Sequence, residues 1–365
     1  MITIVLSITL LGYCLAIIVL IYGFSKVNSF DCLSLEPKTK FSIVVPFRNE
    51  AENLPVLLES FSKLNYPPDL FEVVLVDDSS EERFQLSTFN FQLSIVDNIR
   101  VSNSPKKDAI STAMKFAKND WIVTTDADCV ANENWLLSLD NCIQSRPVLM
   151  IAGAVSYDFK SSFLHHFQLL DLASLQGATM GSFGIQKGFM CNGANFAYTK
   201  SFFLELNGFN GNDAIASGDD VFLLQKAMIQ FPDKVHYLKS VNNIIITKPL
   251  DDWKSLFHQR VRWASKTSSY QSKFGIGLGF LVFGGNLGCL FVLCCLLLGN
   301  LNFYVLFFLL WAKWTVDFIL IHKTNLFLKN KTHSFLRSSF FYPFFSVGVA
   351  FYSLFGKYEW KGRRF

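Results

Sequence analysis

The feature that most constrains this chain is the placement of long apolar segments at both of its ends. Residues 4–24 contain no charged side chain, and residues 276–298 form a second uncharged apolar segment. About 20 consecutive apolar residues are enough for a helix to cross a bilayer. A cleaved secretory signal would carry a basic start and a small-residue cleavage site, and neither is found here. We therefore predict a membrane anchor over residues 1–25, in preference to a cleaved signal or a buried helix of a soluble protein.

The composition supports a membrane-associated protein. The chain is 51% hydrophobic and contains 39 Phe among its 365 residues, which is unusual for a soluble domain. A net charge of +4 is too small to indicate a nucleic-acid partner. Eight Cys occur without CxxC spacing, which favours reduced thiols over disulfides or a zinc site.

The C-terminal part of the chain contains two further apolar segments. Residues 302–321 include Lys313 and Asp317, which are one helical turn apart. They either pair on an inward face or leave the lysine to extend toward the membrane interface. Residues 340–355 are short for a span and contain Pro343, and basic residues flank them on both sides. A membrane span and a re-entrant or interfacial segment both remain open for this stretch.

The middle of the chain has the pattern of an α/β domain. The apolar run FSIVVPF is typical of a strand buried on both faces of a parallel sheet. FEVVLVDDSS and WIVTTDADC predict two more strands, and DAISTAMKFAK has helical periodicity. Asn49 and Glu52 have capping-box spacing before the apolar LPVLLESF, which predicts a helix there. Alternating strands and helices indicate a mostly parallel sheet sandwiched by helices.

Acidic residues follow two of the predicted strands. Asp77 and Asp78 close one strand, and Asp126 and Asp128 follow another. Aspartates at strand ends are often simple turn formers. Ligands of open α/β sheets, however, bind beyond the carboxyl ends of the strands. Two carboxylates one residue apart repel each other, so we expect a divalent cation near Asp126 and Asp128.

The order of motifs resembles a known enzyme family. VVPFRNE, VDDSS, KKDAI, TDADC, GDD and QRVRW follow one another over residues 42–263. This order resembles the family 2 glycosyltransferases, and most closely the membrane-anchored branch with ceramide glucosyltransferases, hyaluronan synthases and cellulose synthases. The resemblance implies a GT-A fold with transmembrane helices, a nucleotide-sugar donor and a hexosyltransferase reaction that inverts the anomeric carbon.

The resemblance also implies how the donor is bound. Asp128 is the expected direct ligand of Mn²⁺ or Mg²⁺, and Asp126 contributes as a second ligand, through water or at the ribose. Lys106 is expected near the diphosphate, with Lys107 as the alternative. The other residues expected to bind the donor are Pro46, Arg48, Glu50, Asp77, Asp78, Gln259 and Arg262.

Catalytic and acceptor roles are assigned in the same way. Asp220 is expected to be the catalytic base with Asp219 as its neighbour, and the reverse assignment remains open. Both lie at an expected helix start, where the helix dipole favours negative charge; a simple N-cap pair is the alternative. Arg262 is expected to grip the diphosphate. The residues expected on the acceptor side are Trp263, Cys191 and Gly193.

The expected organisation follows from these patterns. It comprises a transmembrane helix over residues 1–25, a GT-A domain with interfacial helices over 40–263, membrane helices over 274–357 and a basic tail over 358–365. Residues 161–172 are expected to form an amphipathic helix on the membrane surface, with Asp171 on its solvated face.

The expected function is transfer of a sugar, with a UDP-sugar as the expected donor, to a lipid acceptor at the cytosolic leaflet. We expect a multi-pass protein of the bacterial inner membrane whose catalytic domain faces the cytosol; the oligomeric state is left open. A processive polysaccharide synthase and a non-catalytic membrane scaffold are the alternatives.

Overall fold

The computed structural model describes residues 2–31, 33–82, 88–158, 162–213, 215–297, 303–355, 359–360 and 363–364. The chain forms two compact units, each built from separate stretches of sequence. The strand-rich unit comprises Asn28–Asp158 and Phe189–Lys248. The helical unit comprises Met1–Val27, Phe159–Gly188 and Pro249–Phe365.

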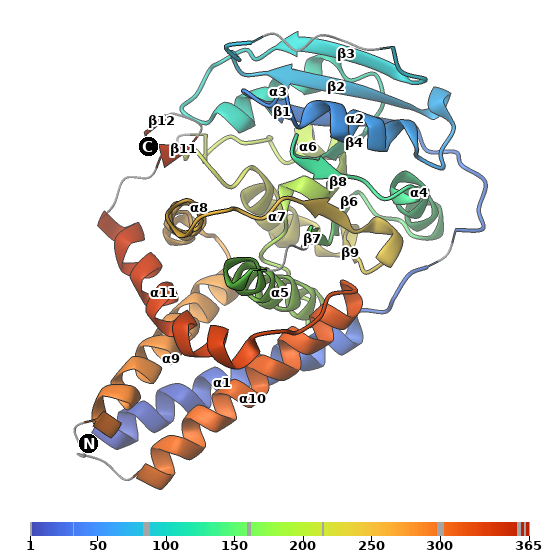
Figure 1. Ribbon diagram of the computed structural model, residues 1–365. Coiled ribbons are helices and arrows are strands. Elements are labelled where there is room, and N and C mark those ends of the chain that lie inside the picture. Colours follow the sequence, from blue (N-terminus) through green and yellow to red (C-terminus); the bar gives the residue numbers. More distant parts are fainter. Residues whose placement is uncertain are drawn as a thin grey trace. The chain divides into compact units, whose positions relative to one another are not determined.

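The strand-rich unit is built on a seven-stranded sheet (Figure 1). In spatial order its strands are β3 (Gln92–Asp97), β2 (Phe71–Asp77), β1 (Phe41–Phe47), β4 (Trp121–Thr124), β8 (Phe196–Thr199), β6 (Met150–Gly153) and β9 (Val235–Leu238). The first four are mutually parallel, β8 runs antiparallel to both of its neighbours, and β9 is parallel to β6. A smaller sheet joins β5 (Cys129–Val130), β10 (Ile245–Thr247) and β7 (Val155–Tyr157). The three predicted strands are confirmed as β1, β2 and β4, whereas the other strands of the two sheets were not predicted.

Helices and short turns connect these strands. The helices are α2 (Leu54–Ser62), α3 (Pro105–Phe116), α4 (Trp135–Ser145), α6 (Lys200–Glu205) and α7 (Asp219–Gln230). The 3₁₀ turns are η1 (Pro68–Leu70), η2 (Gly193–Asn195), η3 (Pro232–Lys234) and η4 (Val241–Asn243). The mostly parallel α/β architecture expected from the sequence is confirmed.

The core explains why FSIVVPF is apolar at nearly every position. Phe41, Ile43 and Val45 join the cluster that includes side chains of α2 and α4. Val44, which points to the opposite face of the strand, is also fully buried. Phe61 of α2 stacks on Trp135 of α4 with ring centroids 6.0 Å apart. Burial on both faces leaves no place for an alternating polar residue, as predicted.

The start of α2 differs from the predicted capping box. The N-cap residue is Asn53, and no side-chain hydrogen bond caps the helix. Asn49 instead adopts φ 54° and its Oδ1 accepts a hydrogen bond of 3.0 Å from the Glu81 backbone N–H. The prediction of a helix is correct, but the predicted cap is wrong because Asn49 holds a loop that is distant in the sequence.

The helical unit contains the long apolar segments. Its helices are α1 (Ile2–Lys26), α5 (Phe163–Gly184), α8 (Trp253–Ser265), α9 (Lys273–Leu297), α10 (Phe303–Phe327) and α11 (Phe335–Phe355). Smaller elements are η5 (Thr267–Ser269), β11 (Glu359–Trp360) and β12 (Arg363–Arg364). Among the described helices, three are long and apolar enough to cross a membrane, over Thr3–Lys26, Lys273–Cys295 and Phe335–Phe355.

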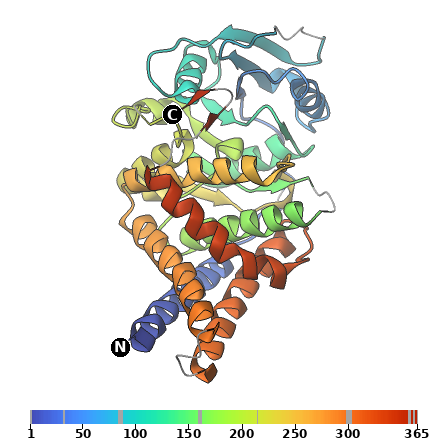
Figure 2. The same ribbon diagram turned by 60° about the vertical axis from the view of Figure 1, so that its left-hand side comes forward.

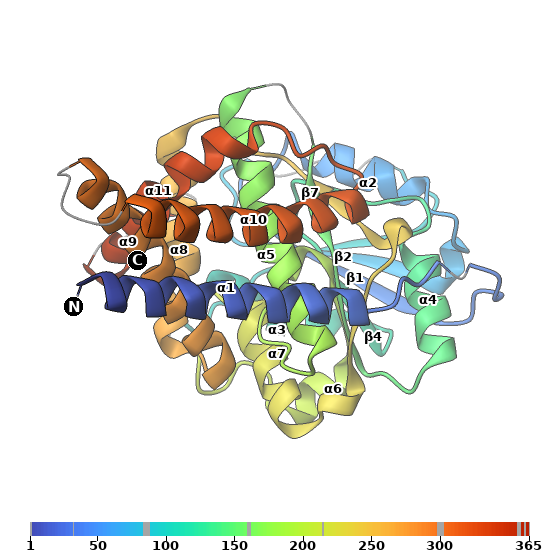
Figure 3. The ribbon, with the colours of Figure 1, turned by 90° about the horizontal axis from the view of Figure 1, so that it is seen from below.

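The helices of this unit pack closely along their lengths. Figure 3 shows α1 and α10 running alongside each other, and both contact α5. Figure 2 shows α11 crossing α5 and α8, which it contacts. Lys313 and Asp317 of α10 form an ion pair of 2.7 Å and are largely buried. Of the two alternatives for these residues, the inward pair is therefore confirmed.

Two local expectations change in this unit. Asp171 of α5 is only 5% exposed and forms a 2.5 Å ion pair with Arg260 of α8. The prediction that Asp171 lies on a solvated face is wrong, because α5 buries residues on several sides. The segment expected over 340–355 is part of the longer helix α11, which continues through Pro343. Its 21 residues are long enough for a span.

The boundaries of the two units do not follow the expected domain over 40–263, since α5 and α8 belong to the helical unit. The expected division into domains therefore remains a prediction. Half of the expected basic tail, residues 358–365, lies outside the described residues.

Candidate active site

The candidate site of the strand-rich unit begins where β4 ends. Asp126 and Asp128 follow this strand and are both partly exposed. The Thr124 hydroxyl donates a hydrogen bond of 2.8 Å to the Gly193 carbonyl and so ties the strand end to η2. The acidic turn is thereby fixed beside the segment that contains Gly193.

Lys106 lies in the first turn of α3 and meets carboxylates from two other segments. Its Nζ is 2.6 Å from Asp126 Oδ1 and 3.5 Å from Asp219 Oδ2. Burial lowers the pKa of Lys106, but Asp126 and Asp219 outweigh it and raise that pKa above its usual value. The side chain therefore stays cationic and joins the two acidic segments.

Asp219 and Asp220 open α7, as the sequence predicted for a helix start. Gly218 precedes them at φ 82°, a conformation that favours glycine. Asp220 Oδ2 accepts a 2.8 Å hydrogen bond from the Gly193 N–H, and Oδ1 accepts one of 2.7 Å from the Val221 N–H. A Cβ on Gly193 would lie 3.1 Å from Asp219 Oδ2. Glycine at 193 thus permits close approach of backbone and carboxylates.

A buried polar network holds η2 in place. The Trp135 indole donates to Asn195 Oδ1 at 3.0 Å. Asn195 Nδ2 donates in turn to the carbonyl oxygens of Ala154 at 2.8 Å and Asn243 at 2.6 Å. This role of Asn195 was not predicted, because the residues NGAN carry no spacing that indicates a buried network. Trp135, Asn195 and Asn243 therefore position Gly193 and, through it, Asp220.

The two lysines of KKDAI are distinguished by their surroundings. Lys107 is 2% exposed and donates to the carbonyl oxygens of Asn212 at 2.6 Å and Ile215 at 2.9 Å. It holds the loop that leads to α7, whereas Lys106 contacts the acidic side chains directly. The geometry thus favours Lys106 over the alternative, Lys107.

Polar residues after β2 are engaged within the strand-rich unit. Asp77 Oδ1 accepts from the Ser80 N–H at 2.9 Å and the Ser80 hydroxyl at 2.6 Å, which is a turn-forming role. Asp78 is 6% exposed, and its Oδ1 accepts from Asn98 at 2.7 Å and Arg100 at 3.4 Å. Arg100 had not been singled out, because a lone arginine in a loop carries no sequence signal.

The residues at the end of β1 that were expected to bind the donor include one that contacts this region. Pro46 is part of β1. Arg48 Nη1 donates to the Asp78 carbonyl at 3.2 Å, which links the ends of β1 and β2. Glu50 Oε2 accepts from Asn53 Nδ2 at 2.5 Å. The ends of the neighbouring parallel strands β1 and β2 therefore bring Arg48 and Asp78 to one edge of the sheet.

The remaining predicted residues belong to other segments of the chain. Cys191 is buried in the strand-rich unit at 9% exposure. Gln259, Arg262 and Trp263 lie on α8 of the helical unit. Cys191 therefore belongs to the strand-rich unit, and the three residues of α8 belong to the helical unit.

Helix α8 is held together by its own side chains. The Arg260 guanidinium lies 4.2 Å from the centre of the Trp263 ring and also donates to Gln259 Oε1. With its ion pair to Asp171, Arg260 is a packing residue of the helical unit. Within the QRVRW motif, Arg260 therefore contacts both Gln259 and Trp263.

The donor set at Asp126 and Asp128 is compatible with a hard cation. Among the described residues, no three His, Cys, Asp or Glu side chains cluster closely enough to hold a metal ion. Mg²⁺ and Mn²⁺ favour carboxylate oxygens, and Mg²⁺ commonly uses one or two carboxylates together with water and substrate phosphates. Two aspartates fit that pattern, with one of them shared with the Lys106 ammonium group.

Comparison with known families agrees with this geometry. Residues 42–206 match the family described as glycosyl transferase family 2. They form a family 2 glycosyltransferase domain. The match ends before Asp219, Asp220 and Arg262, so their roles depend on motif and geometry.

Individual relatives match only part of their own length. Glycosyltransferase AglE of Haloferax volcanii is 24% identical over 32% of this chain and 40% of its own. Human polypeptide N-acetylgalactosaminyltransferase 10 is 33% identical over 34% of this chain and 21% of its own. An undecaprenyl-phosphate 4-deoxy-4-formamido-L-arabinose transferase of Yersinia enterocolitica is 32% identical over 35% of this chain and 38% of its own. The chain thus spans less than half the length of each of these relatives.

A solved structure matches nearly the whole chain. The mannosyltransferase PcManGT from Pyrobaculum calidifontis, in complex with GDP-Man and Mn²⁺, superposes with a TM-score of 0.61 at 12% identity. The match covers 97% of this chain and 99% of that one. At this level of identity the likeness concerns the fold, which is GT-A.

Proposed function

We propose that this protein is an inverting family 2 glycosyltransferase that transfers a sugar from a nucleotide-sugar to a membrane lipid at the cytosolic leaflet. The family 2 domain supports glycosyl transfer. The relative named for undecaprenyl phosphate and the three apolar helices support a lipid acceptor. GDP-Man is present in the PcManGT complex, so a GDP-sugar is tested beside the expected UDP-sugar.

The observation that carries the proposal is the meeting of Lys106, Asp126 and Asp219 within the strand-rich unit. These residues come from α3, from the turn after β4 and from α7, and two contacts of 2.6 Å and 3.5 Å join them. Aspartates that only form turns need no lysine shared with another segment. The contacts of Lys106 with Asp126 and Asp219 therefore favour a binding site over simple turn formation.

A divalent cation is the cofactor we propose. Asp128 and Asp126 would hold Mn²⁺ or Mg²⁺ through their carboxylate oxygens. When bound, such an ion supplies Lewis-acid stabilisation to a departing diphosphate.

Asp220 is the base in the proposed reaction. It accepts the proton of the acceptor hydroxyl while the acceptor oxygen forms a bond to the anomeric carbon. The bond from that carbon to the diphosphate breaks in the same step, and the nucleoside diphosphate leaves with the bonding electrons. Asp220 is more exposed than Asp219, which lies against Lys106, and this difference favours Asp220.

Cationic side chains assist departure of the nucleotide. Lys106 balances negative charge at the acidic cluster of the strand-rich unit. Arg262 is proposed, from its place in the QRVRW motif, to bind diphosphate oxygens through its forked guanidinium. Trp263 is proposed to contact the acceptor.

The test uses the purified full-length chain with UDP- and GDP-sugars, Mn²⁺ and a bacterial lipid extract. Mass spectrometry of the lipids should reveal a species heavier by one sugar. Long polymeric products would instead establish the processive alternative. Donor binding without any turnover would favour the scaffold.

One variant tests the assignment of Asp220 as the catalytic base. Asp220→Asn should bind the donor normally in calorimetry yet lose transfer by about 10²- to 10⁴-fold, the usual contribution of a general base. The control Asp233→Asn changes an exposed aspartate of η3 and should transfer normally. Full turnover by Asp220→Asn would exclude Asp220 as the base.

A further inference from the structure

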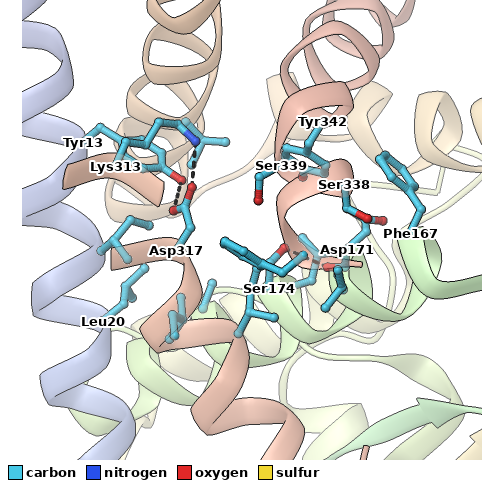
Figure 4. Close-up of a pocket in the computed structure, with 18 of the residues that line it drawn as sticks. Tyr13, Leu20, Phe167, Asp171, Ser174, Lys313, Asp317, Ser338, Ser339 and Tyr342 are labelled. Carbon is cyan, nitrogen blue, oxygen red and sulfur yellow. Dashed lines mark hydrogen bonds and ion pairs between the residues drawn. The ribbon is translucent and has the colours of Figure 1, made fainter. Parts of the chain in front are cut away.

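The helical unit encloses a cavity that the proposed reaction does not use. It has a volume of about 120 Å³ and is lined by α1, α5, α9, α10 and α11 (Figure 4). Most of its lining is aliphatic or aromatic. Cavities between packed helices are common places for apolar ligands. An engineered apolar cavity of about 150 Å³ accepts benzene, so this one has room for a short segment of a lipid.

Polar groups interrupt the apolar lining at two places. On one side, Asp317 accepts a 2.7 Å hydrogen bond from the Tyr13 hydroxyl and pairs with Lys313 at 2.7 Å (Figure 4). On another, Asp171 lies on α5, and Ser338 and Ser339 lie on α11 (Figure 4). Ionisable residues inside an apolar helix bundle are uncommon and often mark a ligand site.

The charges around the cavity compensate one another. Lys313 is paired with Asp317, and Asp171 is paired with Arg260 at 2.5 Å. A phosphate in the cavity would lie near Asp317 and Asp171. The cationic partners of these carboxylates already form ion pairs with them. Burying an uncompensated charge is costly, whereas a neutral hydroxyl needs only hydrogen bonds. The charge balance therefore favours an uncharged ligand.

One buried hydroxyl of the lining has no hydrogen-bond partner among the residues that the structure describes. Ser338 is 4% exposed, and its Oγ has no hydrogen-bond partner among the described residues. Other buried serines of the helical unit, such as Ser182, donate to a carbonyl of their own helix. A buried hydroxyl without a partner is unfavourable, and a ligand hydroxyl would remove that cost. The unpartnered Ser338 hydroxyl thus indicates, independently of the charge balance, that the ligand carries a polar group.

We propose that this cavity binds the hydroxyl-bearing end of an uncharged lipid, such as a diacylglycerol. Its hydroxyl meets Ser338, and the carbon atoms of the lipid nearest to that hydroxyl occupy the apolar part of the cavity. The proposal concerns binding alone and does not require that this lipid be the acceptor of the proposed transfer. The binding proposal and the proposed glycosyl transfer can therefore be disproved independently of each other.

The test measures binding without any sugar donor. The full-length chain is placed in phosphatidylcholine nanodiscs and labelled with a diazirine analogue of dioleoylglycerol, and the labelled peptides are identified by mass spectrometry. Labelling should fall on the helices that line the cavity. Unlabelled dioleoylglycerol should compete, whereas dioleoylphosphatidic acid, which has the same chains and a phosphate, should compete at least about tenfold less well.

Two variants locate the site. Ala178→Phe fills the cavity and should abolish the specific labelling, whereas Ile18→Phe, at an exposed position of α1, should leave it unchanged. Ser338→Ala removes only the unpartnered hydroxyl and should weaken binding about fivefold. It keeps the test valid if Ala178→Phe fails to fold. Undiminished binding by Ser338→Ala, or equal competition by phosphatidic acid, would overturn the proposal.

Discussion

At the scale of single residues, side chains of the strand-rich unit derive their properties from neighbours that are distant in the sequence. Lys106 stays cationic because two aspartates surround it. Gly193 contributes a backbone N–H to Asp220 and leaves room for the adjacent carboxylate. A single substitution at such a position changes more than one interaction, so the most informative variants keep the size of the side chain and remove only its charge.

Asp128→Asn tests the metal site at this scale. The amide is a weaker ligand for a hard cation than the carboxylate, so Mn²⁺-dependent donor binding should weaken by more than about tenfold. Calorimetry with and without Mn²⁺ measures the effect. Asp97→Asn, on the exposed end of β3, is the control. Equal Mn²⁺-dependent affinity in the wild type and Asp128→Asn would contradict the assignment.

His236 predicts a pH dependence of stability. Burial and the nearby Arg146 lower the pKa of His236 to about 4. Its unfolded pKa is about 6.5, so the unfolded state binds a proton more readily as the pH falls. The free energy of unfolding should therefore decrease between about pH 6.5 and pH 4, by on the order of 2 kcal/mol.

Thermal unfolding of His236→Gln measures this contribution. The variant should lose most of that pH dependence, because glutamine does not titrate. The same slope of melting temperature against pH in the wild type and the variant would show that another group is responsible.

At the scale of elements, glycines decide how closely two helices of the helical unit approach. A Cβ at Gly184 of α5 would lie 1.8 Å from the Gly23 carbonyl oxygen of α1. A Cβ at Gly181 would lie 2.4 Å from the Leu20 carbonyl oxygen. Small residues at such crossings allow backbone-to-backbone contact in membrane helices. The ion pair of Asp171 with Arg260 similarly joins α5 to α8.

Gly184→Ala should force α1 and α5 apart. Because the obstructing atom belongs to the backbone, we expect a loss of stability of about 1–3 kcal/mol. Gly277→Ala is the matched control, since a Cβ there meets nothing within 4 Å and alanine favours a helix. Thermal unfolding in one detergent compares the two. Equal melting temperatures would show that the close crossing contributes nothing.

At the scale of the whole molecule, the chain passes repeatedly between two units. The strand-rich unit is assembled from two stretches of sequence and the helical unit from three. Helix α5 lies between β7 and β8 in the sequence but belongs to the helical unit. Neither unit is therefore a continuous segment that truncation could isolate.

Membrane insertion gives a prediction for the intact chain. With three helices long enough to span, the protein should stay in the membrane pellet after a carbonate wash. In the proposed orientation, protease should digest the strand-rich unit in inside-out vesicles and leave it intact in spheroplasts. Release by carbonate would exclude integral insertion, and digestion in spheroplasts would exclude the cytosolic orientation.

The sequence alone was sufficient for the features that depend on local pattern. The uninterrupted apolar run FSIVVPF predicted a strand buried on both faces, and β1 is one. Motif order predicted the GT-A fold, and strand-end aspartates identified Asp126 as a candidate. The strand and the acidic turn follow from residues close together in the chain, whose spacing reports burial or a turn, whereas the GT-A fold follows from the family resemblance of motifs over residues 42–263.

Only the tertiary structure decided the features that join distant segments. Tyr13 and Asp317 are 304 residues apart in the sequence, yet they share a hydrogen bond. Local spacing likewise does not predict the hydrogen bond from the Gly193 N–H to Asp220. Nor does it predict the burial of Asp171 or the buried Ser338 hydroxyl without a partner among the described residues. Periodicity shows that a side chain is buried, but its partner is chosen by packing between elements, which one-dimensional spacing does not contain.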